Sequence, residues 1–137
     1  MRQINYIIIH CSATKAGRDF HAKDIDKWHK ERGFDEIGYH VVIDLDGTVE
    51  NGRSVSKPGA HCKGHNTDSI GVCYIGGLDD KGNPCDTRTE AQKQALLDVV
   101  WTYKKIYPNA KVVGHRDMPN VHKACPCFNA KEEYKNI

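Results

Sequence analysis

Two histidines and one cysteine in this chain have the residue types and positions of a metal site. His10 directly follows the apolar run at residues 6–9, and His115 follows a short strand-like run at residues 111–114. Cys125 comes shortly after His115, within a Lys-Ala-Cys-Pro segment. Two imidazoles and one thiolate suit Zn²⁺ and leave its fourth coordination position open for water, which is typical of catalytic rather than structural zinc. The sequence therefore offers a three-ligand set for a catalytic zinc ion.

The spacing alone leaves rivals for two of these ligands. Cys125 and Cys127 form a Cys-Pro-Cys segment, which differs from the Cys-x-x-Cys of zinc knuckles, so we expect only one of the two to bind the metal. His122 is closer to Cys125 along the chain than His115 is, but a solvated loop histidine is its simpler interpretation. The chain contains no His-Glu-x-x-His motif, in which a glutamate would serve as general base.

Three further polar residues are candidates for the chemistry around the metal. Tyr39 begins a predicted hairpin, where its phenol would donate a hydrogen bond to an oxyanion beside the zinc; the alternative is a cross-strand aromatic. Lys123 would stabilise the same oxyanion electrostatically, unless it is simply a solvated loop lysine. His61 would bind substrate or handle a proton, and its alternative is an ordinary surface residue.

The composition argues against several functional classes. With 137 residues the chain is long enough for one domain (residues 1–137), and its hydrophobic fraction of 39% is ordinary for a soluble globular protein. The formal net charge of +2 and the scattered Lys and Arg residues predict no nucleic-acid partner. No apolar run approaches the ~18 residues of a membrane span, and residues 1–10 lack the features of a signal peptide. We therefore expect synthesis in the cytoplasm and no membrane insertion.

The six cysteines have two interpretations. A secreted disulfide scaffold is one, but the missing signal peptide argues against it. If Cys125 binds metal, the remaining cysteines are odd in number, which fits reduced thiols better than a full set of bridges. Cys11 and Cys73 lie in apolar strand-like runs, where cysteine commonly acts as a small buried hydrophobe.

The elements that must position these residues follow from hydrophobic patterning. Continuous apolar runs predict buried strands, and Asp46-Gly47 between two β-type runs predicts a hairpin. A one-sided apolar pattern predicts a short helix that stops at Gly33 and a longer helix that begins at the capping-box pattern at 87–90 and ends before Pro108. The expected elements are strands at 4–11, 39–44, 48–51, 69–75 and 111–114, helices at 23–32 and from 87–90 onward, and a last helical turn at 129–134.

The expected order of elements, β-α-β-β-β-α-β, predicts a single α/β domain with a mixed central β-sheet flanked by helices. The long helix should cover one face of the sheet and the short helix the other. His10 and His115 each end a strand, so both imidazoles meet at one rim of the sheet if those strands are parallel neighbours. The polar, turn-rich loop at 52–68, which contains His61 and Asn66, is expected to carry function.

Segments typical of one known family run in order from residue 10 to residue 128. They are His10-Cys11-Ser12-Ala13-Thr14, Trp28-His29-Lys30-Glu31, Gly38-Tyr39-His40, Asp46-Gly47-Thr48-Val49-Glu50, Gly52-Arg53, Lys63-Gly64, Asn66, Ser69-Ile70-Gly71-Val72-Cys73, Gly76-Gly77, Asp79-Asp80-Lys81-Gly82, Gly114-His115-Arg116-Asp117 and Lys123-Ala124-Cys125-Pro126. On these segments the chain resembles the zinc-dependent N-acetylmuramoyl-L-alanine amidases, which include the lysozymes of T-odd coliphages and the peptidoglycan recognition proteins. The likeness to the phage enzymes is the strongest.

The resemblance implies one zinc ion per chain on His10, His115 and Cys125, with Tyr39 and Lys123 as catalytic partners. It implies hydrolysis of the amide between N-acetylmuramic acid and L-alanine in peptidoglycan, with the loop that carries His61 and Asn66 lining the substrate groove. Peptidoglycan is then the expected partner of a monomer that acts on the cell wall after release from the cytoplasm.

The resemblance also leaves other interpretations. The alternative function is a peptidoglycan-binding module without turnover, which loss of the cysteine ligand would mark; the presence of Cys125 favours the enzyme. A cytosolic regulatory protein with the same fold is a third interpretation. Two features depart from the family pattern: Cys127 stands where glycine or serine is common and adds a redox-sensitive thiol, and the loop at 116–122 is slightly longer than in the phage lysozymes.

Overall fold

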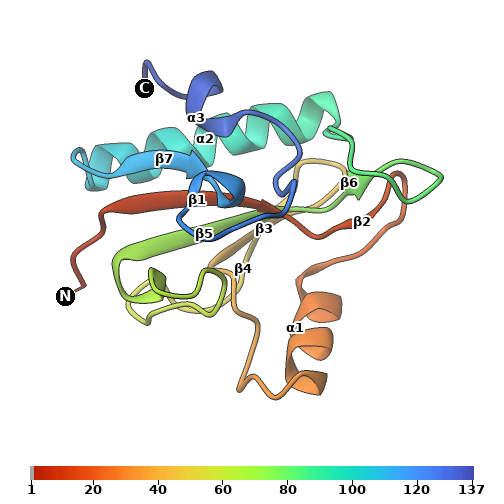
Figure 1. Cartoon of the computed structure of the whole chain (residues 1–137), viewed down its shortest axis with the longest axis horizontal. Coiled ribbons are helices and arrows are strands. Elements are labelled where there is room, and N and C mark those ends of the chain that lie inside the picture. Colours follow the sequence, from red (N-terminus) through yellow and green to blue (C-terminus); the bar gives the residue numbers. More distant parts are fainter. Residues whose placement is uncertain (1) are drawn as a thin grey trace.

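A five-stranded mixed sheet with helices on both faces forms the centre of the computed structural model, which describes residues 2–137 (Figure 1). The strand order is β4-β3-β5-β1-β7, and all neighbours are parallel except the β3–β4 hairpin. The sheet strands are β1 (Tyr6–Cys11), β3 (Val41–Ile43), β4 (Val49–Asn51), β5 (Ser69–Tyr74) and β7 (Lys111–Gly114). The other elements are β2 (Thr14–Lys15), α1 (Ala22–Glu31), η1 (Asn66–Asp68), β6 (Gly77–Leu78), α2 (Glu90–Ile106), η2 (His115–Asp117) and α3 (Ala130–Glu133).

The long helix α2 covers one face of the sheet (Figure 1). The helix begins next to the predicted capping-box pattern at 87–90, but its N-cap is Thr89 rather than Thr87. The Thr89 hydroxyl accepts a hydrogen bond from the Gln92 N–H at 3.0 Å, so Gln92 and not Glu90 completes the capping box. Leu96 and Val100 of α2 belong to the largest core cluster, together with Ile7 and Ile9 of β1. The odd-numbered side chains of β1 therefore point toward α2, since successive residues of a strand face opposite sides.

The short helix α1 lies on the opposite side of the sheet from α2 (Figure 1). Its residue Ile25 packs in a second cluster with Val42 of β3 and Cys73 of β5. Gly33 follows the helix with φ of +97°, a conformation that favours glycine and stops the helix as predicted. The expected arrangement, one helix on each face of a mixed α/β sheet, is thus confirmed.

Two short strands lie where the sequence predicts only loop. β2 and β6 pair in parallel as a separate two-stranded sheet. Each has two residues, too few to show a period in the sequence, and β6 begins at Gly77 with φ of +101°. The predicted hairpin is present with shorter strands than expected, and Gly47 in its turn has φ of +87°.

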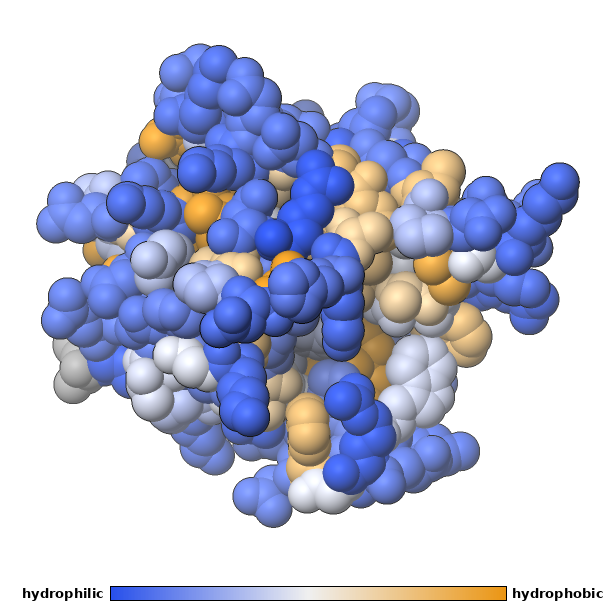
Figure 2. Space-filling model, viewed as in Figure 1, coloured by the Kyte–Doolittle hydropathy of each residue, from blue (hydrophilic) through white to orange (hydrophobic). Residues whose placement is uncertain are grey.

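Hydrophilic side chains predominate on the face shown in Figure 2, with smaller groups of hydrophobic side chains between them. Within residues 2–137, no helix combines the length and apolar character needed to cross a bilayer.

Candidate functional site

The two histidines of the predicted site lie side by side at one rim of the sheet. β1 and β7 are parallel neighbours in which Ile9 pairs with Gly114, so the next residues along the two strands, His10 and His115, lie beside each other. Their ring centroids are 4.4 Å apart. His10 is an even-numbered residue of β1 and points to the face opposite α2. The predicted meeting of the two imidazoles at the carboxyl ends of parallel strands is confirmed.

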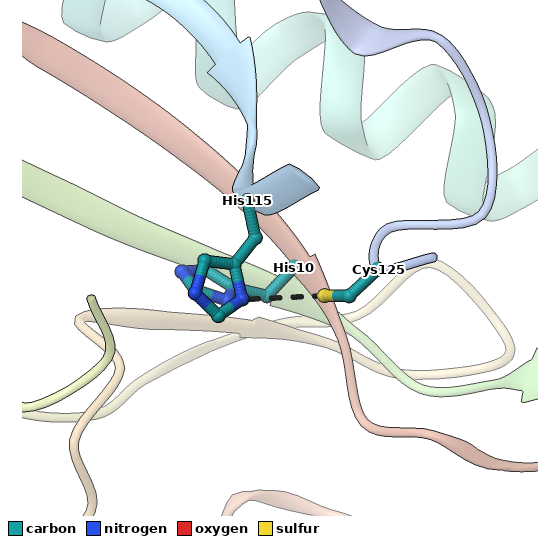
Figure 3. A group of neighbouring side chains, drawn as sticks. All are labelled: His10, His115 and Cys125. Carbon is teal, nitrogen blue, oxygen red and sulfur yellow. Dashed lines mark hydrogen bonds between the residues drawn. The ribbon is translucent and has the colours of Figure 1, made fainter. Parts of the chain in front are cut away.

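Cys125 reaches the same point from the loop that precedes α3 (Figure 3). This loop is fixed to the strand end because the Arg116 N–H donates to the Cys125 carbonyl at 2.8 Å, and the buried Tyr74 hydroxyl donates to the Pro126 carbonyl at 2.6 Å. The Cys125 sulfur lies 3.9 Å from His10 Nδ1. One donor atom from each of His10, His115 and Cys125 falls within 4.8 Å of the other two.

The rival ligands occupy other places. Cys127 has its sulfur 3.9 Å from that of Cys11, and it is not a member of the three-ligand group that the described residues form around His10. His122 is exposed, and it is not a member of the group that His10, His115 and Cys125 form in the described part of the chain. The sequence spacing left Cys125 or Cys127, and His115 or His122, as candidate partners of His10. The structure places Cys125 and His115 beside His10.

A chain of hydrogen bonds sets the orientation and tautomer of His10. His10 Nε2 lies 2.8 Å from His61 Nδ1, and His61 Nε2 lies 3.2 Å from the Ser69 hydroxyl. Ser69 donates its own proton to the His65 carbonyl at 2.6 Å, so it accepts from His61. His61 then accepts at Nδ1 from His10, a proton assignment that follows from the hydrogen-bond network. His10 therefore carries its proton on Nε2 and turns a free Nδ1 lone pair toward Cys125.

The position of His61 depends on two glycines and an asparagine. A Cβ added at Gly71 would lie 2.7 Å from the His61 ring, and one at Gly59 would lie 2.5 Å from it. The Asn66 side-chain oxygen accepts hydrogen bonds from the backbone N–H groups of His61 (2.9 Å) and Cys62 (3.0 Å). The missing side chain at Gly71 thus lets His61 lie against β5, while Asn66 holds its backbone.

The environment keeps these imidazoles neutral at pH 7. Burial lowers the pKa of His10 well below its ordinary value, and the neighbouring His61 and His115 lower it further. Burial, and then the charge of Lys123, lowers the pKa of His115. Burial lowers the pKa of His61 to about 3. A neutral imidazole has the free lone pair that a metal ligand needs.

Tyr39 and Lys123, the expected catalytic partners, both lie near this group. The Tyr39 ring centroid is 5.0 Å from that of His10. Burial raises the pKa of the Tyr39 phenol well above its ordinary value, and the nearby Cys73 and Cys125 sulfurs add to the effect, so the phenol stays protonated and can donate. Lys123 is exposed, and its charge is felt at both His10 and His115.

Three buried polar residues near the site were not singled out from the sequence. Ser69 ends the hydrogen-bond chain of His10. His40 accepts from the Gly71 N–H at 3.0 Å and lies 2.8 Å from the Lys57 carbonyl, and His29 accepts from the Gly38 N–H at 2.8 Å. The sequence contained one indication of these contacts. Ser69 and Gly71 lie two residues apart on one face of an otherwise apolar strand, which indicates that this face packs against polar side chains.

The known proteins that this chain resembles in sequence are amidases and phage endolysins. A family model described as N-acetylmuramoyl-L-alanine amidase matches residues 1–128. An endolysin of Klebsiella phage KP32 is 45% identical over 130 residues, covering 95% of this chain and 85% of that protein. An endolysin of Escherichia phage T7 is 44% identical over 125 residues, covering 91% and 82% of the two chains.

Solved structures agree with this assignment. The N-acetylmuramoyl-L-alanine amidase LysC from Clostridium intestinale URNW superimposes with a TM-score of 0.79 at 27% identity, covering 96% of this chain and 82% of that one. Drosophila PGRP-LB gives a TM-score of 0.80 at 25% identity, covering 99% and 82%. The family match over most of the chain, together with the phage relatives and the shared fold, shows that this protein belongs to the N-acetylmuramoyl-L-alanine amidase family.

Proposed function

We propose that this protein is a zinc-dependent hydrolase that cleaves the amide between N-acetylmuramic acid and L-alanine in peptidoglycan, with one zinc ion on His10, His115 and Cys125. The observation that carries the proposal is the convergence of these three donor atoms within 4.8 Å in a chain of the amidase family. Donors bonded to one tetrahedral zinc ion at about 2.0–2.3 Å lie at comparable separations from one another.

The donor set fits zinc in its chemistry as well as its spacing. The hydrogen bond from His10 Nε2 to His61 leaves Nδ1 as the free ligand atom, an arrangement common for histidines that bind zinc. The Cys11 N–H lies 3.2 Å from the Cys125 sulfur and donates to it, which stabilises a thiolate. Three protein ligands leave a position for water or substrate.

The catalytic roles proposed for Tyr39 and Lys123 follow from their places beside this group. Zinc, when bound, supplies a Lewis acid that polarises a carbonyl and lowers the pKa of a water molecule. Tyr39 donates its phenolic proton in a hydrogen bond to the oxygen of the scissile carbonyl, because burial keeps it protonated. Lys123 adds positive charge near the same oxygen as negative charge develops there.

The roles proposed for His61 and Asn66 differ from the substrate contacts expected from the sequence. Both ring nitrogens of His61 have protein partners, His10 and Ser69. The Asn66 side-chain oxygen holds two backbone N–H groups. We propose that His61 positions the His10 ligand and that Asn66 holds the loop that carries His61.

Replacing His61 by alanine should weaken zinc binding by about 10–100-fold, the usual effect of losing a hydrogen-bond partner of a metal-bound histidine. Gly71→Ala should weaken it in the same direction, because its Cβ displaces the His61 ring. A competition titration with a chromogenic chelator measures both affinities. His122→Ala, which removes an exposed histidine, is the matched control and should leave the affinity unchanged. Wild-type zinc affinity in His61→Ala would show that His61 does not position His10.

The proposed partner is peptidoglycan, the chain acting as a monomer on the cell wall after release from the cytoplasm, without nucleic acid or membrane insertion. The phage relatives are named endolysins, which supports the site of action. One structural neighbour, a point mutant of Drosophila PGRP-LB, was solved in complex with tracheal cytotoxin and shares a TM-score of 0.79 with this chain at 25% identity.

Digestion of purified sacculi tests the proposed reaction. Mass analysis should show free stem peptides that begin with L-alanine beside intact glycan strands. Removal of zinc with a chelator should stop their release, and added zinc should restore it. If the zinc-loaded protein binds sacculi but releases no such peptides, the protein is a binding module and the proposed hydrolysis is wrong.

A further inference from the structure

A second group of ligand-type side chains, separate from the three proposed zinc ligands, lies where α1 begins beside the β3–β4 hairpin. It consists of His21 at the helix N-cap, Asp44 just after β3 and Glu50 in β4. His21 Nδ1 lies 3.1 Å from Asp44 Oδ2 and 3.5 Å from Glu50 Oε2. One nitrogen and two carboxylate oxygens thus fall within 4.8 Å of one another, as in the His10 group.

Asp44 is the member of this group that points to a ligand. Its side chain is directed at His21, yet the residue is only 4% exposed and its Oδ1 has no hydrogen-bond partner among residues 2–137. A buried carboxylate oxygen without a partner is unfavourable, because it has lost its water and gained nothing in return. Burial, and then the neighbouring Glu50, raises the pKa of Asp44 to about 6. The hydrogen bond with Asp44 in turn raises the pKa of His21, so the group favours a positive charge between its carboxylates.

The surrounding contacts hold the other two side chains in place for an ion. His21 Nδ1 is hydrogen-bonded to Asp44 Oδ2 at 3.1 Å, and its Nε2 lies 3.3 Å from the Asp19 carboxylate, so both ring nitrogens face carboxylates. A bound ion would replace the Nδ1 proton, and Asp19 would then accept from Nε2, the usual arrangement of a metal-bound histidine. Glu50 Oε2 accepts from the Ala22 N–H at 3.0 Å, which fixes it to the start of α1. The His21 side chain is 35% exposed, so ions reach the group from solvent.

We propose that His21, Asp44 and Glu50 form a second metal site, which takes a first-row divalent ion such as Mn²⁺ or Zn²⁺. One imidazole and two carboxylates are a donor set for such ions, with water in the remaining positions. A bound divalent ion supplies more positive charge than a protonated His21 and gives the Asp44 carboxylate a strong partner. It also joins the start of α1 to the β3–β4 hairpin. The opposing interpretation is a protonated His21 that pairs with both carboxylates without any metal.

A second histidine–aspartate pair elsewhere in the chain provides a control that separates these two interpretations. His65 Nδ1 lies 3.2 Å from Asp68 Oδ1, nearly the same contact as that between His21 and Asp44. This pair is not part of any three-ligand group that the described residues form. Asp68→Asn therefore removes a carboxylate from a histidine without touching the proposed site.

Mn²⁺ is the first probe, because carboxylates suit it and a thiolate site does not. The full chain, loaded with one zinc ion, is titrated with Mn²⁺ and the free ion is followed by electron paramagnetic resonance. The wild type should bind one Mn²⁺ per chain, and Asp44→Asn and Glu50→Gln should each weaken this by at least about tenfold. Asp68→Asn should bind as the wild type does. Glu50→Gln alters a side chain that is 31% exposed and so provides a test if Asp44→Asn does not fold.

A Zn²⁺ titration read as metal stoichiometry provides the second arm. The wild type should hold a second zinc ion that Asp44→Asn and Glu50→Gln do not hold. Saturable binding of neither ion beyond the first zinc would overturn the second site and support the metal-free His21 pairing. Binding that is equal in the wild type and in both variants would overturn the assignment of its ligands.

Discussion

Cys125→Ser should lose its zinc and its amidase activity, whereas Cys127→Ser should keep both. Cys125 directs its sulfur at His10 Nδ1 and accepts from the Cys11 N–H, while the Cys127 sulfur lies beside that of Cys11. A serine hydroxyl is a much poorer zinc ligand than a thiolate. Loss of a ligand should weaken zinc binding by more than about a hundredfold, beyond the effect of losing a ligand's hydrogen-bond partner.

Metal analysis of the two purified variants, beside release of stem peptides from sacculi, measures both effects. Cys127→Ser is the control because it makes the same chemical change two residues away. Zinc retained in Cys125→Ser and lost in Cys127→Ser would reverse the ligand assignment. Circular dichroism of both variants separates loss of metal from loss of fold.

Tyr39→Phe should lower kcat by about 10²–10³-fold while zinc content stays at one ion per chain, since loss of one oxyanion donor has effects of this size. The substitution keeps the ring, which packs with a centroid distance of 5.0 Å to His10, and removes only the hydroxyl. The hydroxyl is a donor because burial raises the pKa of the phenol well above its ordinary value. Because the donor acts on charge that develops in the transition state, KM should change little.

Tyr6→Phe is the matched control for this variant. Tyr6 is also half-buried and packs edge-on against a histidine, His65, at a centroid distance of 5.3 Å. It lies at the opposite end of β1 from His10 and should leave kcat unchanged. A kcat for Tyr39→Phe within about twofold of the wild type would remove Tyr39 from the proposed oxyanion site.

The sequence predicted the features of this fold and site that local patterns determine. Residues 4–11 and 69–75 read as buried strands because their apolar runs continue without alternation, and Gly33 marked the end of the short helix through its own backbone chemistry. The pattern at 87–90 placed the start of the long helix to within two residues of its N-cap, Thr89. The placement of His10 and His115 at strand ends led to a shared rim, since parallel strands end on the same side of a sheet. That prediction needed only topology, and the pairing of Ile9 with Gly114 confirms it.

The features that sequence patterns missed depend on contacts between distant segments. His61 faces His10 because its loop folds over β5 at Gly71, and nothing in the loop's own residues specifies that approach. The same is true of His21, Asp44 and Glu50, which are brought together by the packing of α1 against the hairpin. β2 and β6 were not predicted for a different reason: each has two residues, too few to show a repeating hydrophobic pattern in the sequence.

Because side chains alternate between the two faces of β1, the number of residues in this strand matters as much as their types. Ile7 and Ile9 face α2, whereas Ile8 and His10 face the other side of the sheet. Whether a residue of β1 packs under α2 or lies on the side of the metal ligands therefore depends on whether its position is odd or even. Deleting one residue from this strand would turn the histidine into the apolar layer beneath α2 and an isoleucine toward the other ligands. Replacing one of these fully buried isoleucines by valine should cost about 0.5–1.5 kcal/mol of stability, whereas deleting one residue exchanges the two faces.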